Sequence, residues 1–207
     1  MHVGDIPQDR QRSKFLAVGF ADSTVKIFSL DLDSCLMRLS SQALPNTPKS
    51  VCLIEYSDPN HNYMTDEVKK ANNLFLHIGL SNGGLFRTSI DEVTGSLTET
   101  RTRFLGNKPV KLFKINVAGR PCLIALSSRS WIGYLDRNNY MLSPILNENL
   151  DFLSGFHSEK ICKDGMVGIV KQTLKIFRVE NLGELFSQTV VPLKNLPRKI
   201  EYSPSIP

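Results

Sequence analysis

The side chains best suited to metal or redox chemistry do not share a usable spacing in this sequence. The chain has four histidines and four cysteines: His2, His61, His77, His157, Cys35, Cys52, Cys122 and Cys162. None of the cysteines form a C-x-x-C pair, and no histidine stands at zinc-ligand spacing from another histidine or from a cysteine. We expect His77 to fill a core or hydrogen-bonded position, because it lies in the strand-like run LFLHIGL. The sequence therefore predicts no metal site.

Nucleophilic and phosphate-binding motifs are also missing from the sequence. The run SSRS at Ser127–Ser130 lacks the G-x-S-x-G context of a serine nucleophile, and nothing marks a histidine paired with it, so we interpret it as a turn. No G-x-x-x-x-G-K-[ST] or G-x-G-x-x-G sequence occurs, and Gly83-Gly84 is expected to supply the positive φ angles of a tight turn. We predict no catalytic residue, no cofactor and no small-molecule substrate.

Carboxylates recur at one place in the sequence pattern, just after an alternating strand: Asp31, Asp91, Asp136 and Glu180. They do not form the closely spaced pair that acid–base catalysis requires. Short acidic side chains accept hydrogen bonds from backbone N–H groups in turns, so turn capping is the expected role.

Basic residues are concentrated between positions 101 and 120: Arg101, Arg103, Lys108, Lys111, Lys114 and Arg120. Side chains alternate along a strand, so Arg101 and Arg103 fall on one side of the TRTRF segment. Two interpretations stay open. These residues form a solvated outer strand face, or Arg101, Arg103, Lys108 and Lys111 form a patch for an acidic protein surface or an RNA backbone. Phe104 and Phe113 fall at expected core positions, which weakens the RNA interpretation, because single-stranded nucleic-acid sites use exposed aromatics.

The elements around these residues repeat. Four segments each read as an apolar strand, a polar turn and an alternating second strand: FLAVGFADSTVKIFSLD, LFLHIGLSNGGLFRTSID, CLIALSSRSWIGYLD and MVGIVKQTLKIFRVE. With turn centres at Asp22, Asn82, Arg129 and Gln172, the spacings are 60, 47 and 43 residues. Propeller blades of four strands repeat about every 40–45 residues. The polar run Ser57–Asn73 is predicted to be an inserted loop and accounts for the longest spacing.

A second pattern has the same period. Proline followed closely by a basic residue begins three predicted first strands, at Pro48, Pro109 and Pro197, and proline suits the start of a strand because it donates no N–H. The copy expected between the last two lacks the proline and falls at LDFLSGF, residues 150–156. The fold class is therefore all-β, a partial β-propeller of about four antiparallel four-stranded blades. The first blade is predicted to begin only at its second strand, near Phe15. A closed four-bladed ring is the alternative.

Composition adds few constraints. The net charge is +5, but 25 basic and 20 acidic residues are interspersed, which is weak support for nucleic-acid binding. No apolar run approaches the roughly 20 residues of a membrane span, so no membrane contact is predicted. Cysteines without pairing motifs suggest small buried hydrophobes in a reducing compartment, the cytosol or the nucleus.

One run is specific enough to suggest a family. HIGLSNGGLFRTSIDEVTGSLTETRTRFLGNKPVKLF, residues 77–113, closely resembles the second propeller of a family of three-propeller proteins. That family includes the large propeller subunit of splicing factor 3B, damaged DNA-binding protein 1 and the large subunit of the cleavage and polyadenylation specificity factor. The words RTRFLGNKPVKLF and SSRSW resemble the splicing member most.

The resemblance implies three seven-bladed propellers and no enzyme activity. Residues 1–196 would be the later half of the second propeller and residues 197–207 the start of the next, so the chain would be a fragment. It implies a nuclear scaffold of the pre-mRNA splicing machinery that supports branch-site recognition through other splicing factor 3B subunits and spliceosomal proteins, with RNA contact indirect. An adaptor in polyadenylation or DNA repair, with direct nucleic-acid binding, is the alternative.

Overall fold

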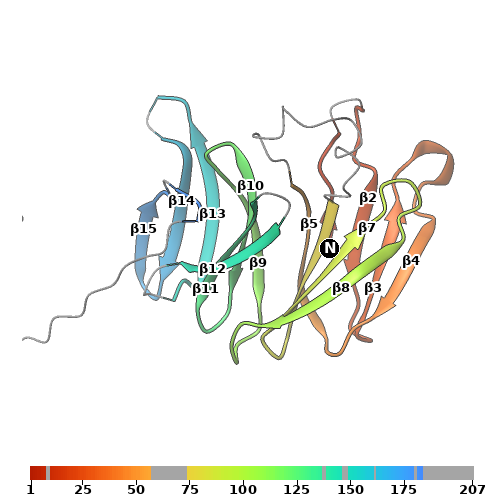
Figure 1. The fold of residues 1–207 in the computed structure, drawn as a ribbon, viewed down its shortest axis with the longest axis horizontal. Coiled ribbons are helices and arrows are strands. Elements are labelled where there is room, and N and C mark those ends of the chain that lie inside the picture. The colour runs from red at the N-terminus through yellow and green to blue at the C-terminus, as the bar shows by residue number, and fades with distance from the viewer. Residues whose placement is uncertain are drawn as a thin grey trace, which may run out of the picture.

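The structure, a computed structural model, describes residues 1–7, 10–56, 74–136, 139–145, 149–160, 162–179 and 181–183. These residues form four antiparallel sheets that follow one another along the chain (Figure 1). We call the sheets blades I to IV in chain order. No helix in the described part is long and apolar enough to cross a bilayer.

Blade I has the strand order β1-β2-β3-β4, with a short 3-10 turn, η1, between its last two strands. The bounds are β1 (His2–Val3), β2 (Phe15–Gly19), β3 (Thr24–Ser29), η1 (Leu32–Ser34) and β4 (Arg38–Ala43). The prediction that this blade begins at its second strand is wrong, because His2 and Val3 pair with Ala17 and Leu16. A two-residue strand is too short to show an alternating pattern.

Blades II and III each contain four strands in sequential order, and three strands of blade IV are described. Blade II consists of β5 (Pro48–Glu55), β6 (Leu74–Leu80), β7 (Gly84–Ile90) and β8 (Leu97–Phe104). Blade III consists of β9 (Lys111–Val117), β10 (Arg120–Leu126), β11 (Ser130–Asp136) and β12 (Asn139–Ile145). Blade IV contains β13 (Phe152–Ser158), β14 (Cys162–Val170) and β15 (Thr173–Phe177).

The four predicted hairpins are confirmed as β2–β3, β6–β7, β10–β11 and β14–β15. Pro48 does begin a strand, whereas Pro109 lies two residues before β9, and LDFLSGF overlaps the first part of β13. The predicted insertion at Ser57–Asn73 and the proline at Pro197 lie outside the described residues. Gly83 has the expected positive φ of +88°, and a Cβ there would lie 1.7 Å from the carbonyl oxygen of Gly106, whereas Gly84 does not have a positive φ.

The core lies between blades, because alternate side chains of each strand point to opposite faces of its sheet. The interface of blades I and II is aliphatic and aromatic, with Ala17, Ile27, Leu76 and Ile78 fully buried. Separate clusters fill the interface of blades II and III and that of blades III and IV. Each buried aliphatic side chain contributes about 1.5–3 kcal/mol, so the stacking of blades is the main source of stability.

Polar contacts join the N-terminal segment of blade I to the first strands of blades II and III. The Nδ1 atom of His2 accepts a hydrogen bond of 3.2 Å from the backbone N–H of Leu53 in blade II. Asp5, just after β1, forms an ion pair with Lys114 of β9 in blade III. The N-terminal segment therefore contacts three blades.

Candidate functional site

The structure places the four predicted patch residues in three locations. Arg101 and Arg103 are exposed on β8, the last strand of blade II. Lys108 is exposed in the connection between β8 and β9. Lys111, at the start of β9, contacts blade IV: its Nζ donates a hydrogen bond of 3.1 Å to the Asp151 carbonyl and lies 3.6 Å from the ring centroid of Phe152. The four residues therefore lie on different elements, and Lys111 is engaged by blade IV.

A third arginine joins Arg101 and Arg103. Arg87 of β7 lies directly opposite Arg101, and Leu85 lies opposite Arg103, so all three arginines face the same side of blade II. The same side carries His77 and Phe75 of β6 and points toward blade III. Like charges directly opposite one another destabilise a strand pair. None of the ion pairs in the described part of the chain involves these arginines.

The Arg87 guanidinium is held between aromatic rings. Its Cζ atom lies 4.1 Å from the ring centroid of Tyr140 in β12 and 5.1 Å from that of Phe75. Cation–π contacts of this kind stabilise the charge and fix its direction. Burial is the main cause that lowers the pKa of Arg87, and the charge of Arg101 lowers the pKa further. The Nη1 atom of Arg87 is buried and has no hydrogen-bond partner among the residues that the structure describes.

Tyr140 reaches Arg87 because Gly133 leaves room for it. Gly133 of β11 lies opposite Leu142 of β12, and a Cβ at Gly133 would lie 2.0 Å from the hydroxyl oxygen of Tyr140. The Tyr140 ring thus packs across the sheet of blade III and makes an edge contact with Tyr56 of blade II.

Buried polar groups without partners gather at this interface. Five buried side-chain atoms have no partner among the described residues, and four of them belong to His77, Arg87, Trp131 and Tyr140. Each of these residues faces the interface of blades II and III. Unpaired buried polar groups cost about 1–3 kcal/mol each, so a concentration of them in one interface calls for an explanation.

His77 occupies the hydrogen-bonded core position that its strand predicted. It is 0% exposed, and its Nε2 shares a hydrogen bond of 3.0 Å with the Tyr56 hydroxyl. Burial, followed by the charge of Arg87, lowers the pKa of His77 to about 3, so the ring is neutral at physiological pH. No group of three metal-binding side chains occurs among the residues that can be described.

The serines and one of the four recurring carboxylates take the structural roles expected of them. Ser127 Oγ donates a hydrogen bond of 2.7 Å to the Lys108 carbonyl, and Ser130 Oγ accepts one of 3.3 Å from the Leu150 N–H, which confirms the turn interpretation. Asp91 caps its turn by accepting hydrogen bonds from the Val93 and Thr94 N–H groups, whereas Asp31 pairs with Arg10 instead. Glu180 lies outside the described residues.

Two sequence expectations about burial need correction. Phe104 is 67% exposed rather than in the core, because the outer strand of a blade has only one flank packed within its sheet, while Phe113 is partly buried against the cluster of blades III and IV. Cys52 and Cys122 are buried, and burial raises the pKa of each thiol to about 12, but Cys35 is exposed.

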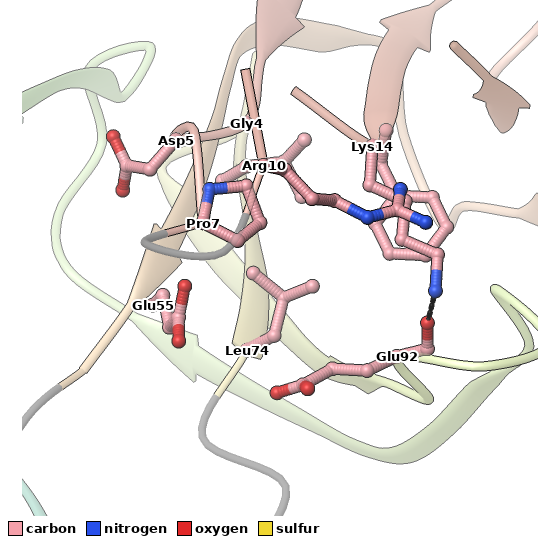
Figure 2. A pocket seen from close by; sticks show the side chains of 10 residues that line it. Gly4, Asp5, Pro7, Arg10, Lys14, Glu55, Leu74 and Glu92 are labelled. Carbon is pink, nitrogen blue, oxygen red and sulfur yellow. Dashed lines mark hydrogen bonds between the residues drawn. The ribbon is translucent and has the colours of Figure 1, made fainter. Parts of the chain in front are cut away.

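A pocket lies at one end of blades I and II, beside the N-terminal segment (Figure 2). Its lining includes Arg10, Lys14, Leu74 and Glu92. Figure 2 shows Lys14 reaching from blade I to the Glu92 carbonyl after β7. Arg10 is engaged by Asp31 at 2.7 Å. These cations hold blade I to its own turns and to blade II, so we assign the pocket no separate function.

Comparison with known proteins identifies the fold family. A family model described as the RSE1/DDB1/CPSF1 second beta-propeller matches residues 3–179. The chain belongs to this family. The match confirms the partial propeller and the resemblance inferred from residues 77–113, and blades I to IV are therefore propeller blades of this family.

Named members of the family are similar along almost the whole chain. Splicing factor 3B subunit 3 of Danio rerio is 45% identical over 204 residues, covering 99% of this chain and 17% of that protein. Spliceosome-associated protein 130 A of Arabidopsis thaliana has the same identity and coverage. Pre-mRNA-splicing factor rse1 of Emericella nidulans is 44% identical over 209 residues, covering 100% of this chain and 16% of that protein. The chain therefore spans about a sixth of the length of these relatives.

A solved structure also resembles the fold. The crystal structure of BBS1N in complex with ARL6DN has a TM-score of 0.55 and 11% sequence identity, covering 86% of this chain and 48% of that one. At this identity the likeness concerns the fold alone.

Proposed function

We propose that this chain is a non-catalytic scaffold element of the pre-mRNA splicing machinery, working in the nucleus and supporting branch-site recognition through protein contacts. On this proposal its partners are other splicing factor 3B subunits and spliceosomal proteins, and contact with RNA is indirect. Residues 1–196 correspond to the later half of the second propeller, and residues 197–207 begin the next propeller. The supporting observation is the 45% identity to splicing factor 3B subunit 3 over 99% of the chain.

The fold suits this role physically. Stacked blades with buried interfaces form a stiff body, while their outer strands and loops remain available for contacts. Inter-blade contacts such as Asp5 to Lys114 and Gln42 to Thr100 hold the blades in fixed positions. A partner bound to one blade is then placed at a defined distance from a partner bound to another.

A segment exchange tests the proposal. The 204-residue matching segment of the zebrafish splicing factor 3B subunit 3 is replaced with this chain, and the chimera is added to a splicing extract depleted of that subunit. We expect the chimera to co-purify with the other splicing factor 3B subunits and to restore splicing of a reporter pre-mRNA.

The control is the same chimera carrying Ile78→Ala, which weakens the core between blades I and II. It should restore less splicing than the unaltered chimera. A chimera that folds, measured by its protease resistance, but joins no splicing complex would contradict the proposal.

A further inference from the structure

The outer edge of blade II is an unpaired strand edge. β8 pairs with β7 on one side and is the last strand of its sheet in the described part of the chain. Every residue from Thr98 to Phe104 is exposed. The backbone N–H and C=O groups on the far side of an edge strand are available to an added strand, which is a common way for proteins to bind extended peptides.

The two arginines on β8 give this edge a defined chemistry. Arg101 and Arg103 are two residues apart and point to the same side, toward blade III. A peptide strand paired with β8 would place its own side chains at positions i and i+2 opposite them. Carboxylates at that spacing would each meet one guanidinium, and arginine pairs with carboxylates through two parallel hydrogen bonds.

Arg87 strengthens the preference for negative charge. It lies directly opposite Arg101 within blade II, and its guanidinium is fixed against Tyr140 and Phe75. Its buried Nη1 has no partner, and none of the three arginines is neutralised by an ion pair in the described part. The sheet therefore carries three positive charges at neighbouring positions. Glu99 of β8 offsets part of the charge at Arg87, and a bound carboxylate would reduce the remaining repulsion.

The described outer strands of blades I and III do not offer the same pattern. β12 contains Pro144, which cannot donate a backbone hydrogen bond, and β4 has a single basic residue, Arg38. Charged residues on an edge strand can also serve only to prevent aggregation. That explanation does not account for Arg87, which is half-buried, held by two rings and left with an unpaired atom.

The observations favour a protein partner over RNA. The aromatic rings on the arginine side, Tyr140 and Phe75, are occupied by Arg87 and are not free to stack on bases. The exposed Phe104 pairs with Gly84 and lies on the opposite side of β8 from Arg103. An RNA site would need aromatics and cations on the same side.

We propose that β8 binds an extended acidic segment of a partner protein as an added strand, with carboxylates two residues apart paired to Arg101 and Arg103. Arg87 positions the site through its charge and through Tyr140. The binding site rests on the described residues and not on the splicing role, so failure of the segment exchange above would leave it standing.

The test uses the whole chain and a fluorescein-labelled eight-residue peptide that alternates valine and glutamate. Its comparison peptide has the same composition, but pairs of glutamates alternate with pairs of valines, so that no two glutamates lie two residues apart. We expect the alternating peptide to bind at least about tenfold more tightly, because only its carboxylates match the spacing of the two arginines. Equal binding of the two peptides would show simple charge attraction and would overturn the proposal.

A charge-reversal pair locates the site. Arg101→Glu with Arg103→Glu should weaken binding of the alternating peptide by more than about tenfold. The control, Arg38→Glu with Lys49→Glu, makes the same change in net charge at two exposed positions of β4 and β5 and should leave binding within about twofold. Arg101→Gln with Arg103→Gln removes the charges without repulsion and should also weaken binding. Circular dichroism checks that each variant is folded.

Two further measurements separate strand addition from its rivals. Two peptides are made, one N-methylated at its odd residues and one at its even residues. An added antiparallel strand donates every second N–H to its neighbour, so one of the two peptides should lose binding and the other should keep it. If both methylated peptides still bind, strand addition is excluded. A twelve-residue uridine RNA should bind more weakly than the peptide; tighter RNA binding that is lost in the Arg101→Glu, Arg103→Glu variant would overturn the choice of a protein partner.

Discussion

The two faces of blade II pack against neighbours of different character. The face toward blade I is filled by aliphatic side chains and Phe86, and Leu76, Ile78 and Ile90 are fully buried there. The face toward blade III contains Tyr56, His77 and Arg87, with Tyr140 packed against them from across the interface. The same four strands thus form an apolar interface on one side and a polar, aromatic interface on the other.

The contrast separates stability from function within a repeated architecture. Among the described residues, the contact of blades I and II leaves one buried polar atom unpaired, Gln42 Oε1, whereas the interface of blades II and III leaves four, at a cost of about 1–3 kcal/mol each. Such groups call for an explanation, and an external ligand is one that the charge of this interface would suit. Arg87, Arg101 and Arg103 lie at the outer end of this polar interface. The cost of the unpaired groups is therefore found next to the proposed binding edge.

The largest expected effect is on the aliphatic side. Ile78→Ala removes a side chain that is 0% exposed and leaves a cavity between blades I and II, so we expect a loss of about 2–5 kcal/mol in unfolding free energy. Urea denaturation followed by tryptophan fluorescence measures it. Ile176→Ala, at a position 67% exposed in blade IV, is the matched control and should change stability by less than about 0.5 kcal/mol. Equal losses of unfolding free energy in the two variants would contradict the view that the interface of blades I and II is a main source of stability.

A smaller effect is expected from crowding the polar side. Gly133→Ala would place a Cβ 2.0 Å from the Tyr140 hydroxyl and push the ring off its position against Arg87, so we expect a loss of about 1–3 kcal/mol. The control is Gly155→Ala in β13, where the nearest atom to the added Cβ is 3.5 Å away, an ordinary contact. If the two variants unfold at the same urea concentration, Tyr140 is not held as described.

The smallest effect is a pH dependence specific to the polar side. The pKa of His77 is about 3 in the folded chain, against 6.5 ordinarily. Below pH 6.5 the imidazole is therefore protonated in the unfolded chain and stays neutral in the folded chain. Stability is therefore lost as pH falls from 6.5 toward 3, and between pH 7 and 5.5 this loss is about 1 kcal/mol.

His77→Phe should remove that part of the slope, while the remaining dependence from other groups stays. Urea denaturation of both proteins at pH 7, 6 and 5.5 measures the difference. If the unfolding free energies of the two proteins change with pH in the same way, His77 is protonated without cost in the folded chain. The interface would then be more accessible to water than the structure indicates.

Much of the fold could be predicted from the residues, because a hairpin leaves a local signature. The turn in SNGG and the alternation on both sides of it predicted β6 and β7 to within a residue, and the recurrence of that signature predicted the blades. β1 was missed because two residues carry no period, although it pairs with β2 across a segment of more than ten residues.

The binding edge was only half predictable. Alternation placed Arg101 and Arg103 on one side of their strand, but Lys108 and Lys111 were grouped with them on sequence proximity alone, and the chain leaves β8 for another blade between them. Arg87 was missed because its contact with Arg101 depends on the register of β7 and β8. The position of Tyr140 depends on blade packing and on the space above Gly133, neither of which a local pattern encodes.

One irregularity in β8 bears on how this edge can change between related sequences. Ser89 pairs with Thr98 and Arg87 with Arg101, so β8 advances by three residues while β7 advances by two. Glu99 has a positive φ of 47° at this bulge. Removing Glu99 would let the ladder continue without interruption and would still leave Arg101 opposite Arg87. A one-residue gap in an alignment at this position is therefore compatible with an intact arginine pair, whereas a one-residue insertion or deletion between Arg101 and Arg103 would turn one arginine to the opposite face.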